Sequence, residues 1–213
     1  MKKILFTVAI VVLGLSNINA QEITFGVKAG VNFAKFGGDI EDTERLTAFH
    51  IGGVAEIALS EKFSLQPEVL FSMQGTSAEY SEPVSGSVNT FESKSNLSYI
   101  SVPVMAKYYI IERLSIEAGP QIGFLVSAKR DYDYTESFNG EVTYTESEDG
   151  ADIKDNFHPI DFGLNFGAGY KLDNGLNFSA RYNLGLVNIA KYAPDGYSTL
   201  NNVIQLSVGY SFN

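Results

Sequence analysis

The sequence predicts an all-β fold, an eight-stranded antiparallel up-and-down transmembrane β-barrel. Apolar and polar residues alternate with a period of two in eight segments, which is typical of strands whose two faces meet different surroundings. The connections between these segments alternate between long and short along the chain. The chain also begins with an export signal, and no later segment has the roughly 18 uninterrupted apolar residues of a membrane helix.

The first 20 residues have the pattern of a signal peptide. Lys2 and Lys3 precede an apolar run over residues 4–15, and the small residue Ala20 stands where a signal peptidase would cut. The apolar run is too short for a membrane helix. We therefore assign residues 1–20 to a signal peptide and residues 21–213 to one barrel domain.

The composition limits the partners. The chain contains no cysteine, which excludes disulfides, thiolate metal sites and a lipid anchor on an N-terminal cysteine. Its formal net charge is −10, which argues against nucleic acid or anionic lipid headgroups as partners held by charge.

The alternation defines the strands one by one. In the first, Val27 and Val31 lie on one face while Lys28 and Asn32 lie on the other. In the third, Pro67 cannot donate to the ladder and predicts a bulge or a local defect in pairing. The eight predicted strands cover residues 23–36, 49–59, 63–73, 99–109, 114–126, 160–171, 176–183 and 203–212.

The sixth and seventh strands form the clearest hairpin. One face of it is continuously apolar and aromatic, and the other carries glycines, amides and charges. The turn at residues 173–175 contains Asn174 and Gly175, a pair that tolerates positive φ. A membrane barrel would turn the apolar face to lipid and the polar face to its lumen.

The connections separate a membrane barrel from a soluble sandwich. Short turns are expected at residues 60–62, 111–113 and 173–175, and long polar loops at 37–45, 75–96, 129–157 and 190–202. We expect the third long loop to extend its neighbouring strands through Tyr132, Tyr134 and residues 142–144. Membrane barrels have short periplasmic turns, long outer loops and even strand numbers, whereas a sandwich has no reason to alternate in this way.

Short motifs in three strands are similar to a known family. They are Val27 to Phe33 (VKAGVNF), Ser101 to Tyr109 (SVPVMAKYY) and Gly209 to Phe212 (GYSF). They resemble the outer-membrane β-barrel domain of Bacteroidetes, described as porin-family or PorT-like, which is similar to the OmpA and OmpX eight-stranded barrels. The resemblance covers essentially the whole mature chain and implies a location in the cell outer membrane.

The resemblance also implies an insertion signal at the C-terminus. Tyr210 and Phe212 would be read by the barrel-insertion machinery, although Asn213 follows Phe212 where many barrels end on the aromatic residue.

The alternation assigns a set of charged and amide side chains to the lumen. In a narrow barrel such charges must pair or stay hydrated, because an unpaired buried charge costs several kcal/mol. We expect a structural network that fills the lumen, with a proton path, an ion path or a gate as the alternative. The expected members are Lys28, His50, Glu56, Glu68, Lys107, Glu117, Asp161 and Arg181, with the amides Gln66, Gln121, Asn165 and Gln205.

No metal, cofactor or catalytic residue is predicted. His50 and His158 are the only histidines, neither in a metal-ligand spacing, and no G-x-S-x-G elbow is present. The clustered carboxylates of the long loops could hold Ca²⁺ or Mg²⁺, but acidic runs usually only solvate a surface. We expect the loop tyrosines Tyr132, Tyr134, Tyr144, Tyr192 and Tyr197 to lie at the membrane interface.

These observations favour an outer-membrane barrel with a structural, adhesive or PorT-like accessory role in the envelope, and no enzymatic activity. The expected partners are outer-membrane lipid, lipopolysaccharide and the insertion machinery, with the chain as a monomer. The alternatives are a small-solute channel, a barrel enzyme acting on lipid or peptide, and a soluble periplasmic barrel. The last of these would need an apolar lumen.

Overall fold

The computed structural model describes residues 22–40, 43–84, 86–194 and 196–212. The expected signal peptide, residues 1–20, lies outside these ranges. Among the described residues, no helix is long and apolar enough to cross a membrane.

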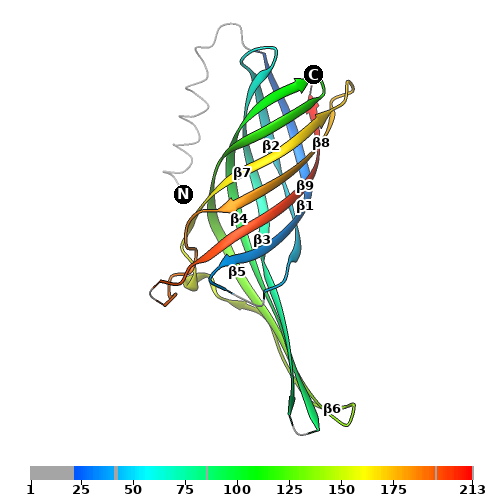
Figure 1. Ribbon diagram of the computed structural model, residues 1–213, viewed down its shortest axis with the longest axis vertical. Helices are drawn as coiled ribbons and strands as arrows, with labels where there is room; N and C mark the ends of the chain where they lie inside the picture. The colour runs from blue at the N-terminus through cyan, green and yellow to red at the C-terminus, as the bar shows by residue number, and fades with distance from the viewer. Residues whose placement is uncertain (1–21, 41–42, 85, 195, 213) are drawn as a thin grey trace.

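Eight antiparallel strands close into a ring (Figure 1). Going around it, the order is β1, β2, β3, β4, β5, β7, β8 and β9, and β9 pairs with β1 to close it. The strands are β1 (Ile23–Gly38), β2 (Leu46–Ala58), β3 (Phe63–Val84), β4 (Ser87–Ile111), β5 (Leu114–Phe138), β7 (Ile160–Lys171), β8 (Leu176–Gly185) and β9 (Thr199–Phe212). The predicted eight-stranded antiparallel barrel is confirmed.

The two faces of the wall follow the period of two. In β9, Gln205 and Ser207 are buried toward the lumen, while Leu206 and Val208 are each nearly half exposed on the outside. The interior is therefore polar and the outer surface apolar, as in a barrel surrounded by lipid. This polar lumen contradicts the soluble barrel with an apolar interior.

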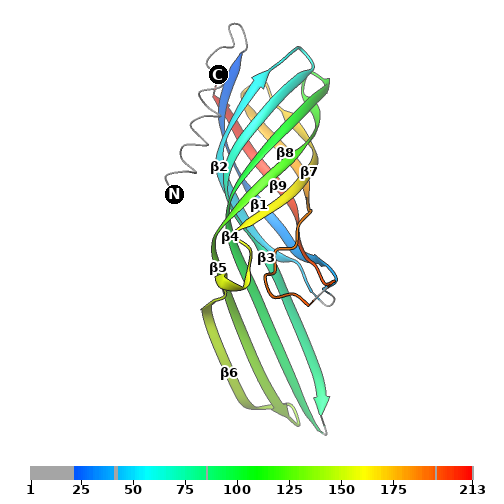
Figure 2. The same ribbon diagram turned by 90° about the vertical axis from the view of Figure 1, so that its left-hand side faces the viewer.

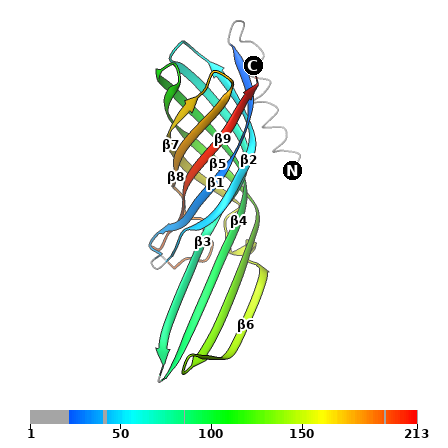
Figure 3. The ribbon, with the colours of Figure 1, turned by 90° about the vertical axis from the view of Figure 1, so that its right-hand side faces the viewer.

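The two ends of the barrel differ. Short turns lie at the end where β1 begins and β9 ends, which we call the short-turn end (Figures 1 and 3). In the turn between β7 and β8, Gly175 has a φ of 88°, the left-handed conformation that the Asn-Gly pair predicts. The other end carries the long connections.

At that other end a sheet extends well beyond the ring (Figure 2). The outer parts of β3, β4 and β5 form it with β6 (Glu141–Asp152), which pairs with β5. We call this the protruding sheet, meaning β3 and β4 beyond the Ser77–Lys94 pair, β5 beyond Lys129, and β6.

The prediction of a long loop at residues 75–96 is therefore wrong. Most of it is strand, because β3 and β4 stay paired up to Val84 and Ser87. Both faces of this hairpin lie in water, so neither face has to be apolar. Its sequence is rich in serine and glutamate and therefore lacks the apolar–polar alternation by which the other strands were predicted. The expected extension of the strand before the third loop is correct at Tyr132 and Tyr134, since β5 continues to Phe138. The expectation is wrong at residues 142–144, which belong to the separate strand β6 and do not extend β7, the strand that follows the loop.

Pro67 interrupts the ladder between β2 and β3. Val54 pairs with Glu68 and Ile57 with Leu65, while the two positions between them are not paired. The register is the same on both sides, so the proline causes a local defect without a bulge, because it has no N–H to donate.

Candidate functional site: the filled lumen and the protruding sheet

The centre of the lumen holds a buried ion network around Glu68. This carboxylate accepts from the Lys28 ammonium at 2.9 Å and from two guanidinium nitrogens of Arg181 at 2.9 and 2.7 Å. Arg181 also donates to both oxygens of Glu117. The four side chains come from β3, β1, β8 and β5, so the network links opposite parts of the ring. Bidentate guanidinium–carboxylate pairs of this kind are geometrically rigid.

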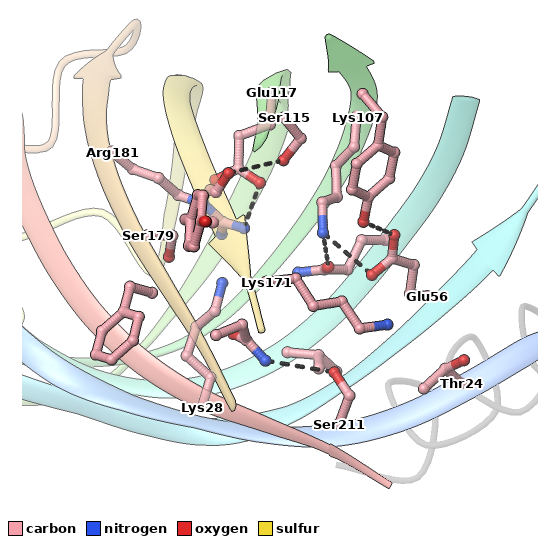
Figure 4. Close-up of a pocket in the computed structure, with 17 residues that line it drawn as sticks. Thr24, Lys28, Glu56, Lys107, Ser115, Glu117, Lys171, Ser179, Arg181 and Ser211 are labelled. Atoms are coloured by element: carbon pink, nitrogen blue, oxygen red, sulfur yellow. Dashed lines mark hydrogen bonds and ion pairs between the residues drawn. The ribbon is translucent and has the colours of Figure 1, made fainter. Parts of the chain in front are cut away.

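A second group of ion pairs lies nearer the short-turn end, where β2 and β4 end. Figure 4 shows Lys107 pointing toward Glu56 in this group. Lys107 donates to Glu56 at 3.1 Å and to Gln66 at 3.0 Å, and the Tyr109 hydroxyl also donates to Glu56. The Lys107 ammonium lies 5.3 Å from the centre of the Tyr109 ring, within cation–π range. Gln66 connects the two groups, because its amide also donates to Glu68 at 2.6 Å.

His50 belongs to a further layer of the lumen, formed with amide and hydroxyl side chains. One ring nitrogen lies 2.8 Å from Asn32 Oδ1 and the other 2.9 Å from the Ser207 hydroxyl. The amide of Gln205 also donates to Asn32 Oδ1, at 3.2 Å. A histidine whose two nitrogens are both occupied in this way is held in place and offers no free nitrogen for a metal.

Asp161 differs from the other lumen carboxylates. It is 6% exposed, and its hydrogen bond comes from the neutral amide of Asn201, at 3.2 Å. Within the part of the chain that the structure describes, no cation lies within salt-bridge distance of Asp161, and its second oxygen has no hydrogen-bond partner.

Glycines make room for the bulky lumen side chains. A Cβ on Gly167 would lie 2.7 Å from Arg181 Cγ, and one on Gly30 would lie 2.8 Å from His50 Cε1. Both distances are shorter than a carbon–carbon contact, so Arg181 and His50 can cross the narrow lumen only because these wall positions lack a side chain.

An apolar cluster closes the lumen at the end opposite the short turns. Phe36 and Phe157 pack there with ring centres 6.1 Å apart. Phe157 and Ile189 belong to the long connections on either side of β7 and β8, and the His158 amide donates to the Ile189 carbonyl at 2.8 Å. The cluster consists of Phe36, Leu97, Tyr99, Leu125, Ala128, Phe157 and Ile189.

Side chains therefore fill the lumen. In the part near the short turns, around Lys28, Lys107 and Arg181, they leave a cavity of about 20 Å³. A single water needs about 10–15 Å³ by the same measure. This region has room for about one water, and the apolar cluster lies beyond it.

The structure places every residue of the expected network inside the barrel. Seven of the eight named side chains are buried, and Glu56 is partly buried against Lys107. Gln66, Gln121, Asn165 and Gln205 are also buried. The alternation pointed to neither Gln74 nor Asn201, because their positions were expected to be next to or within loops. It also gave no sign of the apolar cluster, whose members are scattered over the ends of predicted strands and the segments beyond them.

The remaining candidate residues lie elsewhere. Tyr210 and Phe212 face outward on β9 with ring centres 5.7 Å apart, and His158 is exposed. Among the described residues, no three histidines or carboxylates are grouped closely enough to hold a metal ion.

The protruding sheet presents aromatic residues and carboxylates on one face. Tyr80, Phe91, Tyr134 and Glu146 are paired across its four strands, which puts them on the same face. Phe91 stacks on Tyr132 with their ring centres 6.0 Å apart, and Tyr134 packs against Tyr144 with their ring centres 6.1 Å apart. By the same register Glu82, Glu136 and Glu148 also lie on this face. We call it the aromatic face.

Its tyrosines correct one expectation. Tyr132, Tyr134 and Tyr144 were expected at the membrane interface, but they lie on the protruding sheet beyond the ring. The hydroxyls of Tyr132 and Tyr144 both donate to Glu146, at 3.0 and 3.1 Å, and these bonds raise the pKa of both hydroxyls. The length of the predicted loop could not have shown their position. It depends on the pairing of β5 with β4 and β6 beyond the ring, which places the three tyrosines away from the barrel.

A family match covers residues 19–191, well over half of the chain, and its description is "Outer membrane protein beta-barrel domain". The chain belongs to this family. The outer-membrane location expected from the sequence is thereby confirmed. In such barrels the short turns face the periplasm, so the protruding sheet faces the cell exterior.

Several solved structures are similar at low identity. They include Ail, the attachment invasion locus protein of Yersinia pestis (12% identity, 90% of this chain and 99% of that chain, TM-score 0.46). Neisserial surface protein A has 11% identity over 91% of this chain and 100% of that chain, with a TM-score of 0.45. OprG from Pseudomonas aeruginosa has 12% identity, 91% and 96% coverage and a TM-score of 0.37. No curated protein matches the sequence. Because these TM-scores are below 0.5, the fold assignment rests on the closed ring of strands and on the family.

Proposed function

We propose that this outer-membrane barrel is a surface-recognition protein whose protruding sheet binds a positively charged partner outside the cell. The aromatic face carries the proposal. It holds four glutamates and five aromatic residues, the latter being Tyr80, Phe91, Tyr132, Tyr134 and Tyr144. Aromatic rings attract cations by cation–π contacts, and nearby carboxylates strengthen this attraction.

Exposure supports this role. Tyr80 is 61% exposed, Tyr144 50% and Phe91 39%, although the sheet stands in water. Such a group of exposed aromatic residues is typical of an interaction surface. The filled lumen supports the proposal as well, because it argues against the small-solute channel as the main role. We further propose that the barrel is a monomeric anchor without enzymatic activity.

A binding experiment with a truncated variant tests the proposal. Replacing residues 78–93 and 133–147 each by Asn-Gly removes most of the sheet, because Ser77 pairs with Lys94 and Tyr132 with Glu148. Wild type and variant in nanodiscs of zwitterionic lipid are titrated against an arginine-rich peptide and a glutamate-rich peptide of equal length. We expect the wild type to bind the arginine-rich peptide and the truncated barrel to lose this binding.

A matched pair of variants locates the contact. Tyr80→Ser with Phe91→Ser removes two exposed rings without changing the charge. We expect an affinity loss of about tenfold, since each cation–π contact contributes roughly 0.5–1 kcal/mol. Ser81→Ala with Thr90→Ala on the opposite face is the control and should bind like the wild type. Equal binding by the wild type and the truncated barrel would refute the proposal.

The resemblance to PorT-like proteins supports a second candidate, an accessory part of an envelope machine. It rests on the strand motifs at Val27 to Phe33 and Ser101 to Tyr109. This candidate predicts that the barrel co-purifies with other envelope proteins after mild detergent extraction, and that removal of the protruding sheet leaves this association unchanged.

A further inference from the structure

A small groove lies on the outside of the barrel wall, where the strands reach the outer end of the ring. It has a volume of about 210 Å³. We call it the rim groove, and its main lining residues are Phe33, Lys35, Arg45, Tyr182, Asn202 and Ile204.

The strand register explains why these side chains meet. Ile204 of β9 pairs with Phe33 of β1 on one side and with Tyr182 of β8 on the other, so three apolar or aromatic side chains form one outward row. One step toward the exterior on the same face, Lys35 pairs with Asn202. Arg45 immediately precedes Leu46, the β2 partner of Ala34, which puts it beside Lys35.

The groove therefore has an apolar end in the membrane and a cationic end at its surface. Lys35 and Arg45 are both exposed. Among the described residues, neither lies within salt-bridge distance of a carboxylate, although the chain as a whole carries a net charge of −10. Two adjacent cations that pair with none of the described carboxylates, on the lipid-facing side of an acidic protein, complement an anionic group of the surrounding lipid.

The level of the groove indicates which lipid. It lies at the end of the wall opposite the short turns, and therefore in the outer leaflet of the outer membrane. The anionic groups at that level are the phosphates of lipopolysaccharide, which sit between sugars and acyl chains. Arginine binds phosphate in a bidentate way and lysine binds it as a point charge.

We propose that the rim groove is a docking site for a phosphate of lipid A, the membrane-embedded part of lipopolysaccharide. Lys35 and Arg45 hold the phosphate, Asn202 faces the adjoining sugar, and Phe33, Tyr182 and Ile204 contact the first part of an acyl chain. The groove is smaller than the roughly 300–1,000 Å³ of sites that enclose a drug-sized ligand, so it holds one phosphate and its neighbourhood and leaves the rest of the lipid in the leaflet. The site is independent of the protruding sheet.

Binding of lipid A with and without its phosphates tests the proposal. The full-length mature protein in an uncharged detergent is titrated with diphosphoryl lipid A and with its dephosphorylated form, and bound lipid is counted by native mass spectrometry. We expect the phosphorylated form to bind the wild type at least tenfold more tightly. Inorganic phosphate at millimolar concentration should not displace it, because the acyl chain contributes to binding.

Two double variants with the same change in charge locate the site. Lys35→Gln with Arg45→Gln should remove the preference for the phosphorylated form, whereas Lys62→Gln with Lys94→Gln, both exposed and outside the groove, should keep it. Heat-modifiable mobility on a gel shows that each variant is folded, and the charge-conserving pair Lys35→Arg with Arg45→Lys should keep the preference even if the glutamine pair does not fold. Equal binding of both lipid forms, or an equal loss in both glutamine variants, would overturn the proposal.

Discussion

Glu68 is the residue on which the lumen network depends most. It accepts hydrogen bonds from Lys28, Arg181 and Gln66 and is 2% exposed. Removing its charge would leave two buried cations with Glu117 as the nearest carboxylate of the network. Breaking a buried pair in this way costs about 3–5 kcal/mol.

We therefore expect Glu68→Gln to lower the free energy of unfolding by about 3 kcal/mol. The measurement is urea unfolding in lipid vesicles, followed by circular dichroism because the chain has no tryptophan. A change below about 0.5 kcal/mol, the usual range of surface substitutions, would mean that the lumen is hydrated enough to solvate the two cations without Glu68.

Asp161 should respond in the opposite direction to the same chemical change. It is buried with a neutral amide partner, Asn201, so its charge is costly in the folded state. Asp161→Asn keeps an oxygen for the Asn201 amide and removes the charge. At pH 8, where carboxyl groups are ordinarily ionised, we expect the free energy of unfolding to rise by about 1 kcal/mol or more. A decrease comparable to that of Glu68→Gln would contradict this account.

At the residue scale, the sequence predicted which side chains face the lumen but not how they pair. The alternation of side chains along each strand is enough to assign Lys28, Glu68 and Arg181 to the lumen face. That Arg181 of β8 meets Glu68 of β3 depends on the closure and stagger of the ring, which no local pattern encodes. Gln74 and Asn201 were missed for a related reason, since both lie where a strand continues into a segment expected to be a loop.

At the element scale, the first and last long connections are tied together outside the barrel. The Ser198 amide and hydroxyl donate to the same Asp39 oxygen at 2.8 and 2.9 Å, and the Asp39 amide donates back to the Ser198 carbonyl at 3.0 Å. The bonds from the Ser198 backbone and hydroxyl hold the pKa of Asp39 below its usual range.

This link should weaken in acid. Because the folded-state pKa of Asp39 is lowered, its stabilising effect is fully present above the ordinary aspartate pKa of about 3.9 and is lost as the pH falls through the lower folded value. We expect the Ser198 amide resonance to titrate with a midpoint below about 3.9, and Asp39→Asn to abolish this titration. A midpoint at or above the ordinary value would show that the link does not persist in solution.

The elements were predicted best where one face meets lipid. The hairpin of β7 and β8 follows its expected range closely, since lipid on one side and the lumen on the other impose a strict alternation. The outer parts of β3 and β4 have water on both faces, so pairing and aromatic contacts such as Phe91 on Tyr132 hold them without an apolar period. Strand pairing in water was the part that periodicity could not reveal.

At the scale of the whole molecule, two features of the barrel determine where a partner can bind: its wall and its filled interior. The barrel wall anchors the chain in the outer membrane, while ion pairs and the apolar cluster of Phe36, Phe157 and Ile189 fill its interior. The chemistry available to a partner is then on the outside, on the protruding sheet. If the lumen were open, a solute channel would become the better proposal.

Single-channel recording in planar lipid bilayers tests this central point most directly. The wild-type barrel should insert, as shown by protease protection of its strands in the same lipid, and give no resolved conductance steps in 1 M KCl. The comparison is the double variant Glu68→Ala with Arg181→Ala, which removes the centre of the network. It should conduct if the apolar cluster also opens. Stable, reproducible steps from the wild type would contradict the account, because they would show a continuous water path through a lumen that we describe as filled.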